Sequence, residues 1–256
     1  MTLTLAIISY NEEERIRDVI SSVPLASEVL VLDSGSTDRT REEAESLGAR
    51  VIEADWPGYG EQKNRALKAS TSDWVLSLDA DEVASPELIE SIRQLLEGGA
   101  PEFEGYSAMR RNHWLGKPVK GGVYGPRAKL RLVRRGCGVW VGGILHETLE
   151  VEGGVGLLDG VIEHYPYKDV SDFLSTADNY AELFAEKCLL ENRRAYWWDS
   201  LFRPVLHFVK AFLLNVGFID GLRGFQLARL GALEVRMKWS RAYEAQIKSR
   251  SYERED

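Results

Sequence analysis

Two aspartates, Asp79 and Asp81, directly follow a strand-like apolar run at residues 74–78. Carboxylates two residues apart concentrate negative charge, and like charges at short range repel unless a cation lies between them. Mg2+ and Mn2+ accept carboxylate oxygens and keep positions open for phosphate oxygens. The pattern therefore predicts a divalent cation that holds a diphosphate. Asp-x-Asp is also common in acidic turns before a helix, and Ser85 followed by proline opens such a helix here.

The surrounding elements place this segment at the edge of a sheet. Apolar runs at residues 3–9, 28–32, 49–53 and 74–78 are separated by helix-like stretches. This alternation predicts parallel strands with right-handed crossovers, and ligands of such sheets bind beyond the carboxyl ends of the strands. The Ser, Thr and Asp residues of 33–38 suit the N-cap of the next helix. Polar residues at three strand ends are thus expected to converge on a nucleotide site: Asn11, Glu12, Asp33, Asp79 and Asp81.

Together these motifs resemble the family 2 glycosyltransferases of the GT-A fold, most closely the lipopolysaccharide-core β-1,4-glucosyltransferase group. The resemblance implies an α/β fold of the nucleotide-diphospho-sugar transferase type, with a Rossmann-like mixed sheet flanked by helices and a C-terminal amphipathic helical segment. Many family members have Asp-Asp-Gly-Ser where this chain has Asp-Ser-Gly-Ser from Asp33 on, so the first aspartate alone is carried over. The likeness rests on these segments: Ser9–Glu12, Asp33–Asp38, Gln62–Asn64 and Asp79–Glu82.

The resemblance also implies a function. It is the metal-dependent, inverting transfer of a sugar from a nucleotide-diphosphate donor, expected to be a UDP-hexose such as UDP-glucose, to a hydroxyl of a glycan or glycolipid. The expected setting is cell-envelope polysaccharide or lipopolysaccharide-core synthesis. The donor is expected at a set of polar side chains: Ser9, Tyr10, Glu12, Asp33, Lys63, Asn64 and Asp79.

The cation, Mg2+ or Mn2+, is expected at Asp81 and Asp79. His164 either completes its ligands, contacts phosphate or is a hydrogen-bonded structural histidine. Inverting transfer needs a carboxylate to accept the proton of the acceptor hydroxyl. Glu147 is the candidate for this general base, because it follows an apolar strand end and aligns with a family His-Glu pair. The alternative for Glu147 is a surface acid beside Glu150.

Other functions remain open on the sequence. A polyprenyl-phosphate glycosyltransferase shares the motifs of the N-terminal half and the fold, but its lipid-phosphate acceptor needs no strong base. A nucleotidyltransferase usually carries a glycine-rich phosphate loop with Arg or Lys after the first strand, where this chain has Tyr10-Asn11 and three glutamates. A non-catalytic scaffold is the last option, and the intact Asp79 and Asp81 argue against it.

Length and composition agree with a globular enzyme. The chain has 256 residues, 44% hydrophobic and 28% charged, which suits one domain with an appendage. We predict a catalytic domain at 1–195 and a helical tail at 196–256. The start of the chain lacks the pattern of a signal peptide, so a cytoplasmic location is expected. A glycine-rich segment at 113–125 is either a lid over the donor or a plain surface loop.

The predicted tail combines basic and apolar residues. Residues 201–250 hold nine Lys or Arg and three acids, a charge of +6 in a chain of net charge −8. This asymmetry indicates an anionic partner. The broad apolar surface of 201–216 favours an anionic membrane over nucleic acid. Lys210 and Asn215 interrupt the run, so it is not expected to span. The expected location is peripheral, on the inner face of the plasma membrane. The alternative is an ordinary helix pair of the core.

Overall fold

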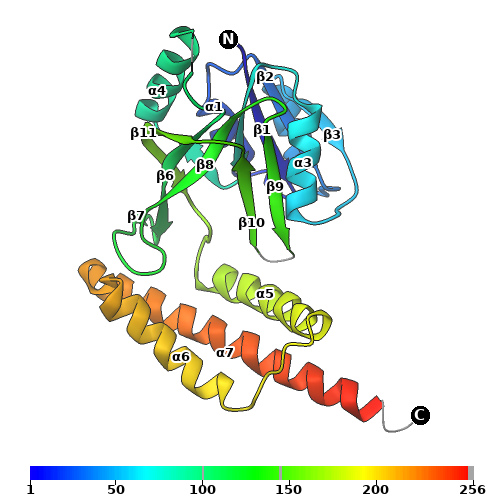
Figure 1. The fold of residues 1–256 in the computed structure, drawn as a ribbon, viewed down its shortest axis with the longest axis vertical. Helices are drawn as coiled ribbons and strands as arrows, with labels where there is room; N and C mark the ends of the chain where they lie inside the picture. Colours follow the sequence, from blue (N-terminus) through cyan, green and yellow to red (C-terminus); the bar gives the residue numbers. More distant parts are fainter. Residues whose placement is uncertain (100, 144–145, 253–256) are drawn as a thin grey trace. The chain divides into compact units, whose positions relative to one another are not determined.

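The computed structural model describes residues 1–99, 101–143 and 146–252, which form two compact units (Figure 1). Unit 1 consists of residues 1–111 and 127–165. Unit 2 consists of residues 112–126 and the chain from Pro166 onward. The short segment 112–126 thus belongs to unit 2, although it is inserted into the sequence of unit 1.

Unit 1 contains a mixed sheet with the strand order β3-β2-β1-β4-β8-β6-β11-β5 among the described residues. The pairs β1–β2, β1–β4 and β2–β3 are parallel, as the apolar runs predict. The pairs β4–β8, β6–β8 and β5–β11 are antiparallel. A separate antiparallel ladder joins β9 and β10. The strands are β1 (Leu3–Ser9), β2 (Glu28–Asp33), β3 (Arg50–Glu53), β4 (Trp74–Asp79), β5 (Glu82–Ala84), β6 (Gly105–Trp114), β8 (Arg127–Arg134), β9 (Gly138–Gly143), β10 (His146–Val151) and β11 (Val155–His164).

Apolar side chains cover both faces of this sheet, because successive residues of a strand point to opposite faces. Leu5 and Ile7 of β1 pack in a core with α1 (Ile16–Ser21), α2 (Thr40–Ser46) and α4 (Pro86–Glu97). Ala6 and Ile8 pack in a second core with α3 (Tyr59–Ala69), β9 and β10. The second core places α3 and the β9–β10 ladder on the same face of the sheet.

Unit 2 is built on three helices, drawn yellow-green to red in Figure 1: α5 (Val170–Leu190), α6 (Asp199–Val209) and α7 (Gly221–Tyr252). Both α5 and α6 pack along α7. Phe173 and Ala177 of α5 meet Leu227 of α7, and Cys188 of α5 meets Trp239. Because α5 buries its apolar side against α7, it belongs with the tail. The unit therefore begins earlier than the predicted boundary at residue 195.

A π-helical turn η1 (Lys210–Leu214) and a 3₁₀ turn η2 (Gly217–Asp220) join α6 to α7. In the part of the chain that is described, no single helix is long and apolar enough to cross a membrane. One bent helix pair, Asp199–Leu214 with Gly217–Ser249, meets that criterion together across a 73° bend.

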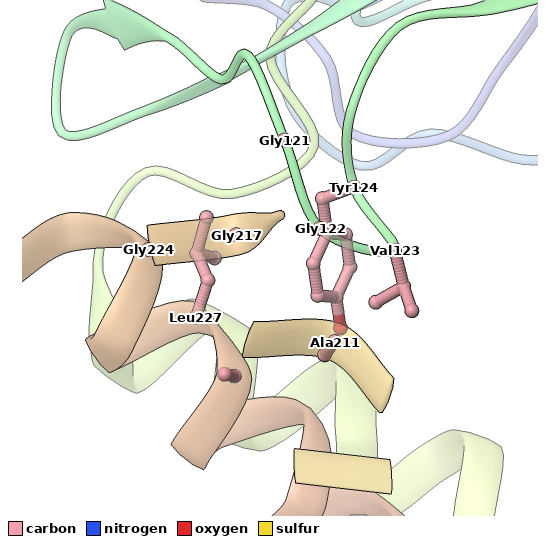
Figure 2. A pocket seen from close by; sticks show the side chains of 9 residues that line it. Gly121, Gly122, Val123, Tyr124, Ala211, Gly217, Gly224 and Leu227 are labelled. Atoms are coloured by element: carbon pink, nitrogen blue, oxygen red, sulfur yellow. The ribbon is translucent and has the colours of Figure 1, made fainter. Parts of the chain in front are cut away.

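The inserted segment, which includes β7 (Lys117–Pro118), is held against this helix junction. The backbone N–H groups of Lys120 and Gly121 both donate to Asp220 Oδ2 at 2.9 Å. Figure 2 shows the loop around Gly121 facing the junction. A Cβ at Gly121 would lie 2.4 Å from the carbonyl oxygen of Val216, so glycine permits this close approach. These contacts fix the loop in unit 2 and give its glycines a packing role, which differs from the lid expected as one possibility.

Candidate active site

The carboxyl ends of β1, β2 and β4 meet at one edge of the sheet. Ser9 lies level with Asp33 in the β1–β2 register, and Ile8 lies level with Asp79 in the β1–β4 register. Ser9 Oγ donates to Asp33 Oδ2 at 3.0 Å. The structure therefore brings the predicted residues of three strands to one place, where ligands of such sheets bind.

Asp33 holds the turn that follows β2. Its side chain is fully buried, and Oδ1 accepts from the N–H groups of Gly35 at 3.1 Å and Ser36 at 2.8 Å. Oδ2 accepts from the hydroxyls of Ser9 and Ser36. Gly35 has φ +86, a conformation that favours glycine. These bonds give Asp33 a structural role, and its predicted contact with the donor stays a prediction.

Side chains after β2 also fix the loop that follows β1. Asn11 has φ 55, and its Oδ1 accepts from Thr37 N at 2.8 Å. Glu12 N donates to Thr40 Oγ1 at 2.7 Å. Asp38 of the predicted N-cap cluster accepts from Thr40 N at 3.0 Å at the start of α2, while Arg39 directly before the helix makes no side-chain capping bond. The hydroxyls of Ser36 and Thr40 accept hydrogen bonds from the loop after β1, whose backbone N–H groups need acceptors.

Exposed aromatic side chains lie at the entrance to α3 and after β1. Tyr10, Trp56 and Tyr59 are 58%, 46% and 42% exposed, and the rings of Trp56 and Tyr59 meet edge to face at 4.7 Å. Burial raises the pKa of Tyr59, and the carboxylates of Glu147 and Asp79 raise it further. Tyr59 therefore lies near the acidic residues of the site. Such rings suit stacking against a base or sugar. Tyr10 was predicted, whereas Trp56 and Tyr59 were missed.

A chain of alternating charges connects the predicted residues. Lys63 Nζ lies 2.8 Å from Asp79 Oδ1 and 2.8 Å from Glu147 Oε1. Arg131 Nη2 lies 3.0 Å from Asp79 Oδ2 and 2.7 Å from Glu82 Oε1. Lys63, Arg131 and Glu82 are buried, so each charge depends on its partners. Both oxygens of Asp79 are engaged by cations of the protein itself, which already relieve the repulsion that the sequence pattern suggested.

The pKa shifts follow from this arrangement. Burial opposes ionisation of Asp79, but Lys63 and Arg131 outweigh it and hold the pKa of Asp79 well below its usual range. Burial lowers the pKa of Lys63, but Asp79 and Glu147 more than offset this, so that pKa is raised. Asp79 and Lys63 thus remain charged at neutral pH. Sequence reasoning missed Arg131 and Glu82, although a charged residue inside an apolar strand and a third acid after Asp-Ala-Asp were visible signals.

The ring of Trp140 on β9 packs against the two cations of this charge network. Lys63 Nζ lies 4.4 Å from the Trp140 ring centroid, and the Arg131 guanidinium carbon lies 5.3 Å from it. Both distances suit cation–π attraction. The Asn64 side chain donates to Trp140 O at 2.9 Å and accepts from Trp140 N at 2.8 Å. Asn64 therefore fastens α3 to β9, while its predicted donor contact stays a prediction.

Asp81 and His164 lie together at the start of β5 and the end of β11. His164 Nε2 is 3.1 Å from Asp81 Oδ2, and both side chains are partly exposed. A carboxylate oxygen and an imidazole nitrogen are ligands that Mn2+ accepts. Within residues 1–99, 101–143 and 146–252, no cluster of three or more His, Cys, Asp or Glu is arranged to hold a metal ion. A cation here therefore needs oxygens from a bound diphosphate or water to complete its ligands.

Comparisons with known proteins found relatives of this chain. The model of the family described as Glycosyl transferase family 2 matches residues 4–132. A lipopolysaccharide core biosynthesis glycosyltransferase, LpsC of Rhizobium meliloti, is 29% identical over 95% of this chain and 93% of its own length. An uncharacterized glycosyltransferase of Rickettsia typhi is 28% identical over 96% of this chain and 88% of its own.

Solved structures with partial likeness include glucosyl-3-phosphoglycerate synthase from Mycobacterium tuberculosis in complex with Mn2+ and uridine-diphosphate-glucose. The match has a TM-score of 0.37 and 32% sequence identity, and it covers 43% of this chain and 44% of that one.

Proposed function

The chain belongs to glycosyltransferase family 2, and from this premise we propose that it transfers a hexose from a UDP-hexose, such as UDP-glucose, to a hydroxyl of a glycan or glycolipid with inversion. The nucleotide-sugar transferase activity and the GT-A type of mixed sheet come with the family. One observation supports inverting transfer with Glu147 as the base. The ammonium of Lys63 bridges Glu147 on β10 and Asp79, which lies at the strand end where ligands of such sheets bind.

In this proposal Glu147 is the general base. Its Oε1 is held by Lys63, and Oε2 is assigned the proton of the acceptor hydroxyl. The hydroxyl oxygen then attacks the anomeric carbon from the face opposite the nucleoside diphosphate. The bond to the diphosphate oxygen breaks in an oxocarbenium-like transition state, by analogy with other glycosyl chemistry. Lys63 also supports the strand end through Asp79, so one cation positions both parts of the site.

The residues fit a divalent cation, Mg2+ or Mn2+, held by Asp81 and His164. Their 3.1 Å contact supplies one oxygen and one nitrogen donor at the sheet edge. When bound, the cation neutralises negative charge on the departing nucleoside diphosphate. Asp79 is a weaker candidate ligand, because Lys63 and Arg131 occupy its two oxygens.

We propose a lipopolysaccharide-core or related cell-envelope acceptor. The support is the Rhizobium meliloti relative, which is described as a lipopolysaccharide core enzyme and aligns along nearly the whole chain. The donor is tested by a thermal-shift screen of nucleotide sugars with Mn2+. A ligand at 100 times its dissociation constant stabilises a protein by ~2.7 kcal/mol, so UDP-hexoses should raise the melting temperature and GDP-mannose should not. Equal shifts with GDP-mannose would contradict the donor assignment.

We also propose a peripheral location on the cytoplasmic face of the plasma membrane. The support is an apolar ridge formed by exposed side chains of α6, the turn η1 and the start of α7. Side chains four residues apart on α6 share one side of the helix. The ridge residues are each more than half exposed: Phe202, Val205, Leu206, Leu213, Leu214 and Leu222. Groups of exposed apolar side chains of this kind mark sites of interaction with proteins or membranes.

The charges around the ridge favour an anionic lipid surface. The carboxylates between residues 197 and 223 are Asp199 and Asp220, and both are buried. Asp199 Oδ1 accepts from Arg203 Nε at 2.6 Å, and Asp220 accepts from the inserted loop. Exposed Lys210 and half-buried Arg223 then leave this face positive. Apolar side chains flanked by basic ones are typical of membrane-interface helices.

A further inference from the structure

Basic side chains gather on one face of the β6–β8 pair. Arg110 lies opposite Arg127 in the register, and Ala108 lies opposite Lys129. Residues directly opposite each other in a strand pair share a face, as do residues two apart along a strand. Arg127 and Lys129 therefore share a face of β8, with Arg110 of β6 beside them. The register shifts next to Arg131, which joins the group through Glu82, the carboxylate that it shares with Arg110. We call these four residues the basic cluster.

The basic cluster starts at the proposed active site and extends away from the nucleotide residues. The paired register of β4 and β8 ends at Leu76 and Leu132. Arg131, the preceding residue of β8, reaches Asp79 Oδ2 at 3.0 Å, and Lys129 and Arg127 lie further along β8 from this contact. In the strand order β2-β1-β4-β8-β6, this is the side of β4 opposite to Ser9 and Asp33. A ligand on the cluster would adjoin the catalytic carboxylates without occupying the ends of β1 and β2.

The cluster carries more positive charge than its neighbours neutralise. Glu82 Oε1 is shared by Arg131 at 2.7 Å and Arg110 at 3.3 Å. Across the described residues, no ion pair joins Arg127 or Lys129 to a carboxylate. Burial lowers the pKa of half-buried Lys129, and the guanidinium groups of Arg110 and Arg131 lower it further.

An ordinary solvated basic surface does not explain this arrangement well. A half-buried ammonium among guanidinium groups is destabilised unless an anion accompanies it. Guanidinium and ammonium groups bind phosphate through charge-assisted hydrogen bonds. We infer that Arg127 and Lys129 bind a phosphate group of the acceptor, next to the site of sugar transfer. The assignment of this phosphate to the acceptor rests on the proposed function, whereas the existence of the anion site does not.

The test measures binding and needs no turnover. Inorganic phosphate is titrated into the full chain and into the variant R127Q/K129Q, and binding is followed by 31P NMR at constant ionic strength. R135Q is the matched control, because Arg135 is an exposed arginine just past the other end of β8. We expect R127Q/K129Q to weaken phosphate binding by about tenfold or more, and R135Q to leave it unchanged. The melting temperature of R127Q/K129Q should not fall, since the change removes like-charge repulsion.

A second titration separates the two sources of phosphate. UDP with Mn2+ should bind R127Q/K129Q within about twofold of the unmodified chain, because the donor lies on the other side of β4. Parallel losses of UDP and phosphate would overturn the inference and assign the cluster to the donor diphosphate. Undetectable phosphate binding, or equal binding by R127Q/K129Q, would overturn the site altogether. None of these outcomes depends on Glu147, so failure of the proposed base would leave them intact.

Discussion

Lys63 Nζ lies 2.8 Å from Glu147 Oε1, although 84 residues separate the two in the chain. The same ammonium lies 2.8 Å from Asp79 Oδ1, and Lys63 is 3% exposed. A buried cation between two carboxylates connects a helix, a strand end and the β9–β10 ladder. The contact explains how a glutamate far along the sequence comes to adjoin the Asp-Ala-Asp segment.

Replacing Lys63 by methionine should destabilise the fold as well as the site. Two partly buried carboxylates would then lose their shared cation, and breaking a buried ion pair typically costs ~3–5 kcal/mol. We expect a loss of about this size in the free energy of unfolding by urea. Lys68→Met is the matched control, because Lys68 is exposed on the same helix. Equal stability of the two variants would contradict the network.

Asp81→Asn should remove metal-dependent donor binding. Calorimetry on the unmodified chain should show that its affinity for UDP falls at least ~10-fold, or about 1.4 kcal/mol, when EDTA replaces Mn2+. The variant should bind UDP weakly under both conditions and keep its melting temperature. If the unmodified chain binds UDP equally well in EDTA, the cation plays no part in donor binding.

Glu28 should make stability depend on acid pH. Burial raises the pKa of Glu28, but hydrogen bonds from Thr4, Arg50 and Thr71 outweigh it and lower the pKa from 4.5 to about 2. A depressed folded-state pKa stabilises the fold above pH 4.5, and this contribution is lost as the pH falls towards 2. Glu28→Gln should therefore cost about 1 kcal/mol at pH 7, discounted for partial exposure, and much less at pH 2.5.

Urea unfolding at the two pH values measures this difference. Glu45→Gln is the control, because Glu45 is an exposed glutamate of α2. A Glu28→Gln penalty that is the same at pH 2.5 and pH 7 would show that the ionised carboxylate is not what stabilises the fold.

Changing Leu206, Leu214 and Leu222 together to serine should abolish most vesicle binding at every salt concentration, because apolar burial is not screened. Lys210→Gln with Arg223→Gln should weaken it mainly at low salt. Co-sedimentation with anionic vesicles measures both. Leu157→Ser with Leu190→Ser is the control, since these leucines are also exposed. Unchanged sedimentation of the triple variant would exclude the ridge as the lipid contact.

The structure favours these leucines over two other apolar residues of the tail, Phe208 and Phe212. Phe208 and Phe212 stack at 5.5 Å, and both meet Phe225 edge to face. A polar change at Phe212 would disturb this packing, so a loss of vesicle binding could then result from misfolding alone.

The sequence predicts the parallel half of the sheet well and the antiparallel half poorly. The apolar runs of β1, β2 and β4 end in polar residues, and local pattern suffices to place Ser9, Asp33 and Asp79 at one edge. The partners of β8 depend on pairings between distant segments, which no local pattern specifies. In the sequence Arg131 is therefore indistinguishable from the other arginines of its strand. Only the fold brings it to Asp79 and Glu82.

Tertiary packing also explains two features that the local sequence pattern does not specify. The helix α5 has the length and pattern of a helix that could end a catalytic domain, but its small buried residues match α7. Of the predicted N-cap cluster at 33–38, Asp38 accepts from Thr40 N at the start of α2, whereas Ser36 accepts from Asn11 N in the loop after β1. Both outcomes depend on which segment lies alongside, and one sequence does not reveal that.

The most direct test of the account is the turnover of Glu147→Gln with a UDP-hexose and its acceptor. Glutamine keeps the shape of the side chain and removes the base, and loss of a positioned base typically lowers the rate by ~10²–10⁴. We expect a fall of this order with UDP binding unchanged, and Glu150→Gln on the same strand should retain activity. A near-normal rate for Glu147→Gln at saturating acceptor would contradict the assignment and would favour an acceptor phosphate that needs no base.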